Sequence, residues 1–189
     1  MFVFTSFLWA HAGHEHVSIV PTHVRWGLTG MTEMKNLHPI VVHFPIALLM
    51  ASALFYLMGI LFRKENFFFI GKWLLYFGTV GAAIAVWSGL EAAEHVLHNE
   101  EAHLIMVPHQ YLGIGIFVLG FLFSLWLFFS KVNIPAKGRL IFLVGMLCLA
   151  AVITQQADFG GRLVFLHGVG VGKKNNAEPN HSEHHHLGD

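Results

Sequence analysis

Charged residues are scarce in this chain. Only 12% of its 189 residues are Asp, Glu, Lys or Arg, whereas 55% are hydrophobic and the mean hydropathy is +0.60. A water-soluble domain carries about 25% charged residues and needs less apolar surface for its core. The 11 basic and 11 acidic residues also cancel, so no net charge favours nucleic acid as a partner. The composition therefore predicts a protein embedded in a lipid bilayer.

Cysteine is nearly absent. The single Cys148 lies inside an apolar run and has no second cysteine with which to form an internal disulfide. A CxxCH motif needs two thiols, so covalent attachment of haem is excluded. No hydrolytic triad, phosphate-binding loop or nucleotide-binding motif is recognisable either. The sequence therefore names no reaction, and we expect a protein that is not an enzyme on its own.

Four apolar runs, about 40–62, 73–97, 105–129 and 138–157, take up most of the chain. Each is close to the roughly 20 residues that cross a bilayer as a helix, and none alternates as a barrel strand would. Since the connectors are short, neighbouring helices must run antiparallel. We therefore predict an all-α fold, an integral membrane four-helix bundle with up-down-up-down topology.

The flanking segments differ in composition from the four runs. Residues 1–9 are apolar and precede Ala10-His11-Ala12, which has the form of a signal-peptidase site. We therefore divide the chain into a signal peptide over residues 1–12, a His-containing outer segment over 13–36, a transmembrane domain over 37–172 and a disordered His-rich tail over 173–189.

The basic residues predict the orientation of the bundle. The first connector holds Arg63, Lys64 and Lys72, and the third holds Lys131, Lys137 and Arg139, whereas the second has neither Lys nor Arg. Basic connectors stay in the cytoplasm. We therefore predict a multi-pass protein of the cytoplasmic membrane, with both termini outside.

Histidine is abundant, with 15 residues, and it is unevenly placed. No histidine occurs between residues 44 and 94 or between 110 and 166. In the predicted topology the histidines of the bundle therefore gather on the outer side: His38, His43, His95, His98, His103, His109 and His167. Imidazoles inside a membrane are costly unless they have a partner, so this side is the candidate site.

One interpretation is a transition-metal site. Glu91, Glu94, His95 and His98 are spaced so that they share one face of the second helix, and imidazole with carboxylate suits zinc, iron or copper. His38 and His103 are the additional candidate ligands on the same side. The alternative is that Glu91–His95 and Glu94–His98 are pairs that only neutralise each other.

Haem b is the competing ligand. His43 and His109 each lie about a turn inside the outer boundary, on the first and third helices, and could supply two axial imidazoles. Arg162 could meet a propionate, unless it pairs with Asp158, and His167 could cap the site. Two such histidines in a bundle can also simply form hydrogen bonds.

Four short motifs carry a resemblance to a known family. They are Leu37-His38-Pro39, Val42-His43-Phe44-Pro45, Gly160-Gly161-Arg162-Leu163-Val164 and His167-Gly168-Val169-Gly170-Val171. They resemble the opening and closing signatures of a bacterial membrane-protein family known only as a domain of unknown function, over about residues 36–172. The resemblance implies four membrane spans, sometimes attached to cytochrome-like modules, and no established activity.

Together these patterns favour a haem- or metal-binding redox or sensing subunit of a bacterial inner membrane, with a cytochrome-like or other redox membrane partner. A transporter or proton relay is the alternative, because His is the side chain that changes charge near neutral pH, and the same His and Glu groups would serve it. A purely structural membrane subunit is the third hypothesis.

Overall fold

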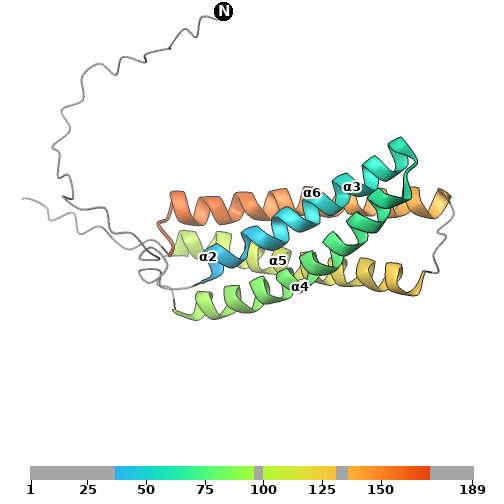
Figure 1. Ribbon diagram of the computed structural model, residues 1–189. Helices are drawn as coiled ribbons and strands as arrows, with labels where there is room; N and C mark the ends of the chain where they lie inside the picture. The colour runs from blue at the N-terminus through green and yellow to red at the C-terminus, as the bar shows by residue number, and fades with distance from the viewer. Residues whose placement is uncertain (1–36, 96–99, 131–135, 171–189) are drawn as a thin grey trace, which may run out of the picture. The chain divides into compact units, whose positions relative to one another are not determined.

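The computed structural model describes residues 37–95, 100–130 and 136–170, and in these ranges it contains helices and no strand (Figure 1). The elements are α2 (His38–Val41), α3 (His43–Phe62), α4 (Glu65–His95), α5 (Glu100–Phe129) and α6 (Ala136–Phe165). The predicted signal peptide, the segment 13–36, His98, Lys131 and the tail 173–189 lie outside the described residues.

Four stretches are long and apolar enough to cross a membrane: His38–Phe62, Glu65–His95, Glu100–Phe129 and Lys137–Phe165. The predicted all-α fold with four spans is confirmed. The helices are longer than the apolar runs, however: α4 begins at Glu65 rather than at 73, and α6 ends at Phe165 rather than at 157. Backbone hydrogen bonding continues beyond the hydrocarbon layer, whereas an apolar run stops at its edge.

α2 and α3 form one span with a local interruption. Val42, between them, keeps right-handed helical angles, and its N–H still bonds the carbonyl of His38 at 3.0 Å. The interruption falls where Pro45 has no N–H to donate to the carbonyl of Val41. The chain therefore enters the bundle already helical at His38.

The helices pack as a closed ring in which α3 contacts α4, α4 contacts α5, α5 contacts α6 and α6 contacts α3. Between them lies an apolar core whose most buried members are Leu49, Leu75, Phe142, Met146 and Leu149. Glycines allow the close approach: a Cβ at Gly78 would lie 2.8 Å from Leu49, and one at Gly120 would lie 3.0 Å from Thr79. These glycines serve helix packing.

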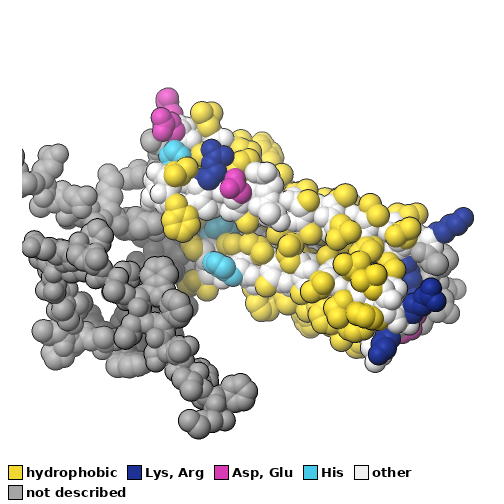
Figure 2. Space-filling model, turned by 90° about the horizontal axis from the view of Figure 1, so that it is seen from above, with side chains coloured by type: hydrophobic (Ala, Val, Ile, Leu, Met, Phe, Trp, Pro, Cys, Tyr) yellow, Lys and Arg dark blue, Asp and Glu magenta, His cyan; other side chains and the backbone are white. Residues whose placement is uncertain are grey.

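The two ends of the bundle differ in charge (Figure 2). At the end that holds the start of α4 and α6, the basic end, Arg139 binds Glu65 at 2.9 Å and so ties α6 to α4. At the other end, the histidine end, α2 and α5 begin and α4 and α6 terminate (Figure 1). All the histidines that the structure describes come from this end: His38, His43, His95, His103, His109 and His167.

Candidate functional site

Two imidazoles meet inside the histidine end. His38 of α2 and His109 of α5 are both partly buried, and their ring centroids lie 6.4 Å apart with the planes at 89°. His38 is the first residue of its span, whereas His109 lies well inside α5. Because these residues come from helices that are far apart in sequence, the contact exists only in the assembled bundle.

Helix α4 holds the ring of His38. Its Nδ1 lies 3.2 Å from the hydroxyl oxygen of Ser88, and that hydroxyl donates to the carbonyl of Ala85 at 3.1 Å. With its only proton committed, the oxygen of Ser88 accepts from Nδ1–H. The next residue, Gly89, makes room, since a Cβ there would lie 2.8 Å from Cε1 of His38. The ring thus occupies the space beside Gly89, which the side chain of any larger residue at position 89 would fill.

Helix α6 holds the ring of His109 in the same way. The Nδ1–H donates to the main-chain oxygen of Gln156 at 3.0 Å, and one turn later a Cβ at Gly160 would lie 3.1 Å from Cε1. The side-chain nitrogen of Gln156 lies 3.4 Å from Nε2 of His109. Pro108, inside α5 directly before the histidine, frees the carbonyl of Leu104 and loosens the helix at this point.

These hydrogen bonds fix the tautomers. A neutral imidazole has one N–H and one lone pair, and in both rings the N–H is at Nδ1. The lone pair of each ring is therefore at Nε2. Metal-bound histidines show the same arrangement, in which the ring nitrogen that does not bind the metal donates to a carbonyl or another acceptor. The pair is chemically able to hold a metal between its rings or to pass a proton.

A small apolar cluster lies beside the pair. Ala102, Met106 and Leu163 are buried there, and Val169 packs against them. Val169 reaches this place because Gly168, at φ 63, reverses the chain after α6, and the N–H of Val169 bonds the carbonyl of Leu163 at 2.9 Å. The chain therefore folds back over the histidine end at Gly168 and Val169.

A family model described as "Predicted membrane protein (DUF2231)" matches residues 34–173. The chain belongs to this family. No curated protein and no solved structure matches it. Membership establishes a membrane protein and assigns it no activity, so the site of this family member has to be interpreted from its own residues.

The structure places His43 away from the pair. It is exposed, and its Nδ1 lies 2.6 Å from the main-chain oxygen of Pro39, one turn earlier. The ring contact of His109 is with His38 instead. Of the two histidines that the sequence suggested as axial ligands, only His109 lies beside a second imidazole. That imidazole belongs to His38, which the sequence suggested as a metal ligand.

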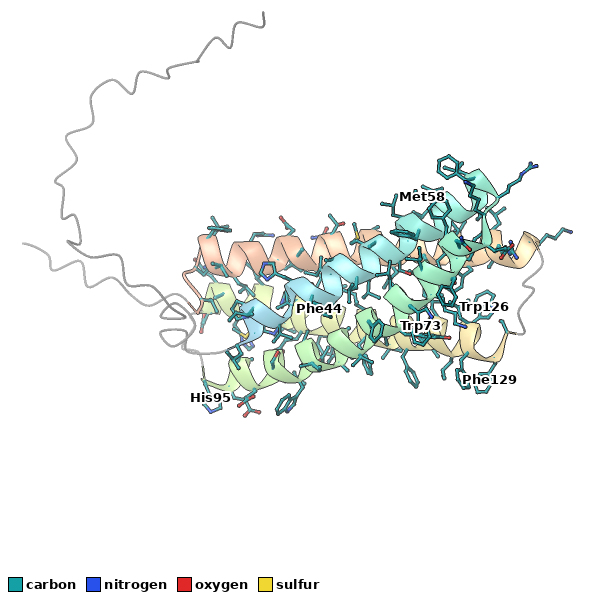
Figure 3. All side chains as sticks on the ribbon, viewed as in Figure 1. Phe44, Met58, Trp73, His95, Trp126 and Phe129 are labelled. Atoms are coloured by element: carbon teal, nitrogen blue, oxygen red, sulfur yellow. The ribbon has the colours of Figure 1, made fainter. Side chains whose placement is uncertain are left out.

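The acidic face of α4 is not assembled into a cluster. Glu91, Glu94 and His95 are exposed, and His95 points away from the bundle (Figure 3). Its Nδ1 bonds the main-chain oxygen of Glu91 at 2.8 Å rather than the carboxylate. Nowhere in the described ranges do three or more His, Cys, Asp or Glu side chains meet as a metal-binding group.

The remaining candidates lie at the same end of the bundle as the pair. His103 is exposed at the start of α5, and His167 is partly buried just after α6. Arg162 is exposed on α6, with its guanidinium 5.9 Å from the ring centre of Phe159. The predicted pairing of Arg162 with Asp158 is not among the ion pairs of the part of the chain that the structure describes.

Sequence reasoning missed Ser88, Gly89 and Gln156 as parts of the site. Each had a weak signal: Ser88-Gly89 is a small polar pair inside an apolar run, and Gln156 is one turn before the Gly160 of the family motif. Their role could not be read from the pattern, because it depends on which helices pack against α2 and α5.

Proposed function

We propose that this membrane protein binds haem b between His38 and His109 and acts as an electron-transfer or redox-sensing subunit of a bacterial cytoplasmic membrane. The observation that carries the proposal is the geometry of the two rings. All four spans contribute to it, through His38, Ser88, His109 and Gln156.

The ring separation is compatible with a metal that both imidazoles would hold. An imidazole nitrogen lies about 2 Å from a bound transition metal, and a ring centre lies about 1 Å behind its nitrogen, so rings on opposite sides of one metal are about 6 Å apart. The observed separation is 6.4 Å. Perpendicular ring planes are compatible with this, because rotation about the metal–nitrogen bond leaves the bond length unchanged.

The ligand count favours haem over an isolated ion. A porphyrin supplies four nitrogens itself and asks the protein for one or two axial ligands. An ion held only by protein would need about four ligands, and the described residues bring no third His, Cys, Asp or Glu to the pair. The side-chain nitrogen of Gln156 lies 3.4 Å from Nε2 of His109, and this long contact is easily released.

Two features explain how the protein would control such a group. The Nδ1 partners, Ser88 and the carbonyl of Gln156, hold the rings and raise the basicity of Nε2. The cluster of Ala102, Met106, Leu163 and Val169 provides an apolar surrounding at the histidine end. An apolar, partly closed surrounding is one of the means by which a protein sets the redox potential of a haem.

A proton relay is the second candidate, and one observation favours it. Gln156 contacts both nitrogens of His109, and the rings of His109 and His38 lie edge to face with their centroids 6.4 Å apart. A histidine that is satisfied in this way needs no metal. It could exchange protons with its neighbour as pH changes near neutrality.

Absorption spectroscopy of the purified protein tests the proposal. We expect a Soret band. We expect His38→Ala and His109→Ala each to remove or shift it, because each variant removes one of the two imidazole ligands. His43→Ala is the matched control: it removes an exposed imidazole of the same span and should leave the band unchanged.

The other outcomes are equally informative. A band that depends on His43 and not on His38 would return the axial role to the pair first suggested by the sequence. A folded protein with neither haem nor iron would overturn the haem proposal and leave the relay, whose activity should then change with pH as the two imidazoles titrate.

A further inference from the structure

Helix α6 has an exposed face unlike those of the other helices. The exposed faces of α4 and α5 carry large apolar side chains that suit lipid, among them Trp73, Phe77, Ile84, Trp87, Ile114, Val118, Phe121 and Leu122. On α6 no large hydrophobic residue is exposed between Leu147 and Val164. Its exposed side chains over that stretch are small or polar, namely Cys148, Ala151, Thr154, Gln155, Ala157, Asp158 and Arg162.

Five of these residues fall on one stripe with heptad spacing. Cys148, Ala151, Gln155, Asp158 and Arg162 are separated by alternating steps of three and four, and all are exposed. The stripe continues at the same spacing in both directions, through exposed Val144 and Phe165. A regular alternation of three and four is the pattern with which one helix packs along another in a left-handed pair.

The charges on this stripe have no partner on it. Asp158 and Arg162 are one turn apart, yet the ion pair formed within the described ranges is the distant Arg139–Glu65. Beside them is a shallow, open hollow of about 300 Å³ lined by Asp158, Gly161, Arg162, Phe165 and Leu166. A neighbouring helix could supply hydrogen-bond and charge partners to Gln155, Asp158 and Arg162.

We propose that this stripe is the contact between two copies of the chain, with α6 packed against α6 of the second copy. Two copies in one membrane share one orientation, so a twofold axis along the membrane normal sets the two helices parallel. Residues of equal number then face each other across the axis, as the a and d positions of a parallel pair do.

The side chains suit this arrangement layer by layer. Cys148 and Ala151 are small and let the two backbones approach closely. The Gln155 amides can hydrogen-bond across the axis, since each has both donors and an acceptor. The two Asp158 carboxylates share a layer, and each lies next to the Arg162 of the second copy in the following layer.

The stripe on α6 is complementary to itself, which favours a second copy of the chain as its partner. A twofold contact requires that the same surface provide both partners of every interaction. Asp158 and Arg162 carry opposite charges one layer apart, so two equivalent ion pairs form, and Gln155 is its own partner. A helix of a different protein would need only charges complementary to this stripe. It would not explain why an acidic residue, a basic residue and an amide occur together on it.

Cross-linking in the native membrane tests the proposal directly, because the only cysteine of the chain, Cys148, is on the stripe. We expect copper-phenanthroline oxidation of the unaltered protein to give a covalent dimer, since small residues at a facing layer bring Cα atoms within disulfide range. Cys148→Ala should lose this dimer. Adding Ala151→Cys to Cys148→Ala should restore it, whereas adding Val118→Cys, on the exposed face of α5, should not.

Charge reversal provides the second measurement. Asp158→Arg places four positive charges around the axis and should sharply reduce the dimer linked through Cys148. The double variant Asp158→Arg and Arg162→Asp should recover it. If Val118→Cys cross-links as well as Cys148, or if Asp158→Arg leaves the yield unchanged in a protein that retains its helical circular dichroism, the α6 contact is overturned.

Discussion

At the scale of single residues, the hydroxyl of Ser88 carries the most specific consequence of the haem proposal. It accepts a hydrogen bond from Nδ1–H of His38 and donates one to the main-chain oxygen of Ala85. Ser88→Ala would remove the acceptor and leave the ring of His38 free to turn. We expect haem affinity to fall by about tenfold or more, while the Soret band of the loaded protein persists. Titration of the haem-free protein with haem measures the change.

Thr154→Ala is the control for this variant. Its hydroxyl bonds the carbonyl of Ala150 in the same helix at 3.0 Å and faces away from the pair. Haem affinity that is equal in the two variants would contradict a role of Ser88 in holding the ring.

The identity of the imidazole pair could be predicted only in part. His38 and His43 are five residues apart, which places them on different faces of the first span, so at most one can face α5. The pattern of apolar residues does not choose between them, because both lie near the boundary of the span. Which histidine faces α5 is decided by the space beside two glycines: Gly89 leaves room for the ring of His38, and Gly160 leaves room for that of His109. These spaces exist only when the helices are packed together.

At the scale of the elements, the contact between α3 and α4 depends on how closely their backbones approach. A Cβ at Gly78 would lie 2.8 Å from the side chain of Leu49 and 3.2 Å from its main-chain nitrogen, so the two helices would have to separate. We expect Gly78→Ala to destabilise the bundle by about 1–3 kcal/mol. Unfolding in detergent, followed by circular dichroism, measures this.

Gly115→Ala gives the matched comparison. No atom lies within 4 Å of a Cβ at this position, so the change adds helix propensity without a clash. We expect it to be neutral or to stabilise by up to about 1 kcal/mol. Equal destabilisation by the two variants would mean that the α3–α4 contact is looser than described.

Helix number was predictable, whereas helix length was not. The apolar runs revealed four spans because lipid leaves no other spanning structure. They could not reveal the first turns of α4, where Glu65 and Lys72 lie, or the last turns of α6, where Asp158 and Arg162 lie. These turns extend beyond the hydrocarbon, since α4, with 31 residues, is about 46 Å long against a core of about 30 Å.

At the scale of the whole molecule, the basic end predicts the orientation. Arg63, Lys64, Lys137 and Arg139 all lie there, and the described residues of the histidine end include Arg162 as their only Arg or Lys. We expect reporter fusions after Lys64 and after Arg139 to be cytoplasmic and a fusion at Glu100 to be external. An external signal at Lys64 would invert the molecule and move the imidazole pair to the cytoplasmic side.

The connection between α3 and α4 has a consequence for how the protein is made. Only Arg63 and Lys64 separate these helices, and Arg63 adopts a left-handed conformation, φ 53, that turns the chain back sharply. A hairpin this tight can complete its packing in the membrane while α5 and α6 are still being synthesised. His38 and Ser88 belong to this early half and His109 and Gln156 to the late one. The imidazole contact can therefore form only after the late half has joined the early one, and any group bound there would connect the two halves of the chain.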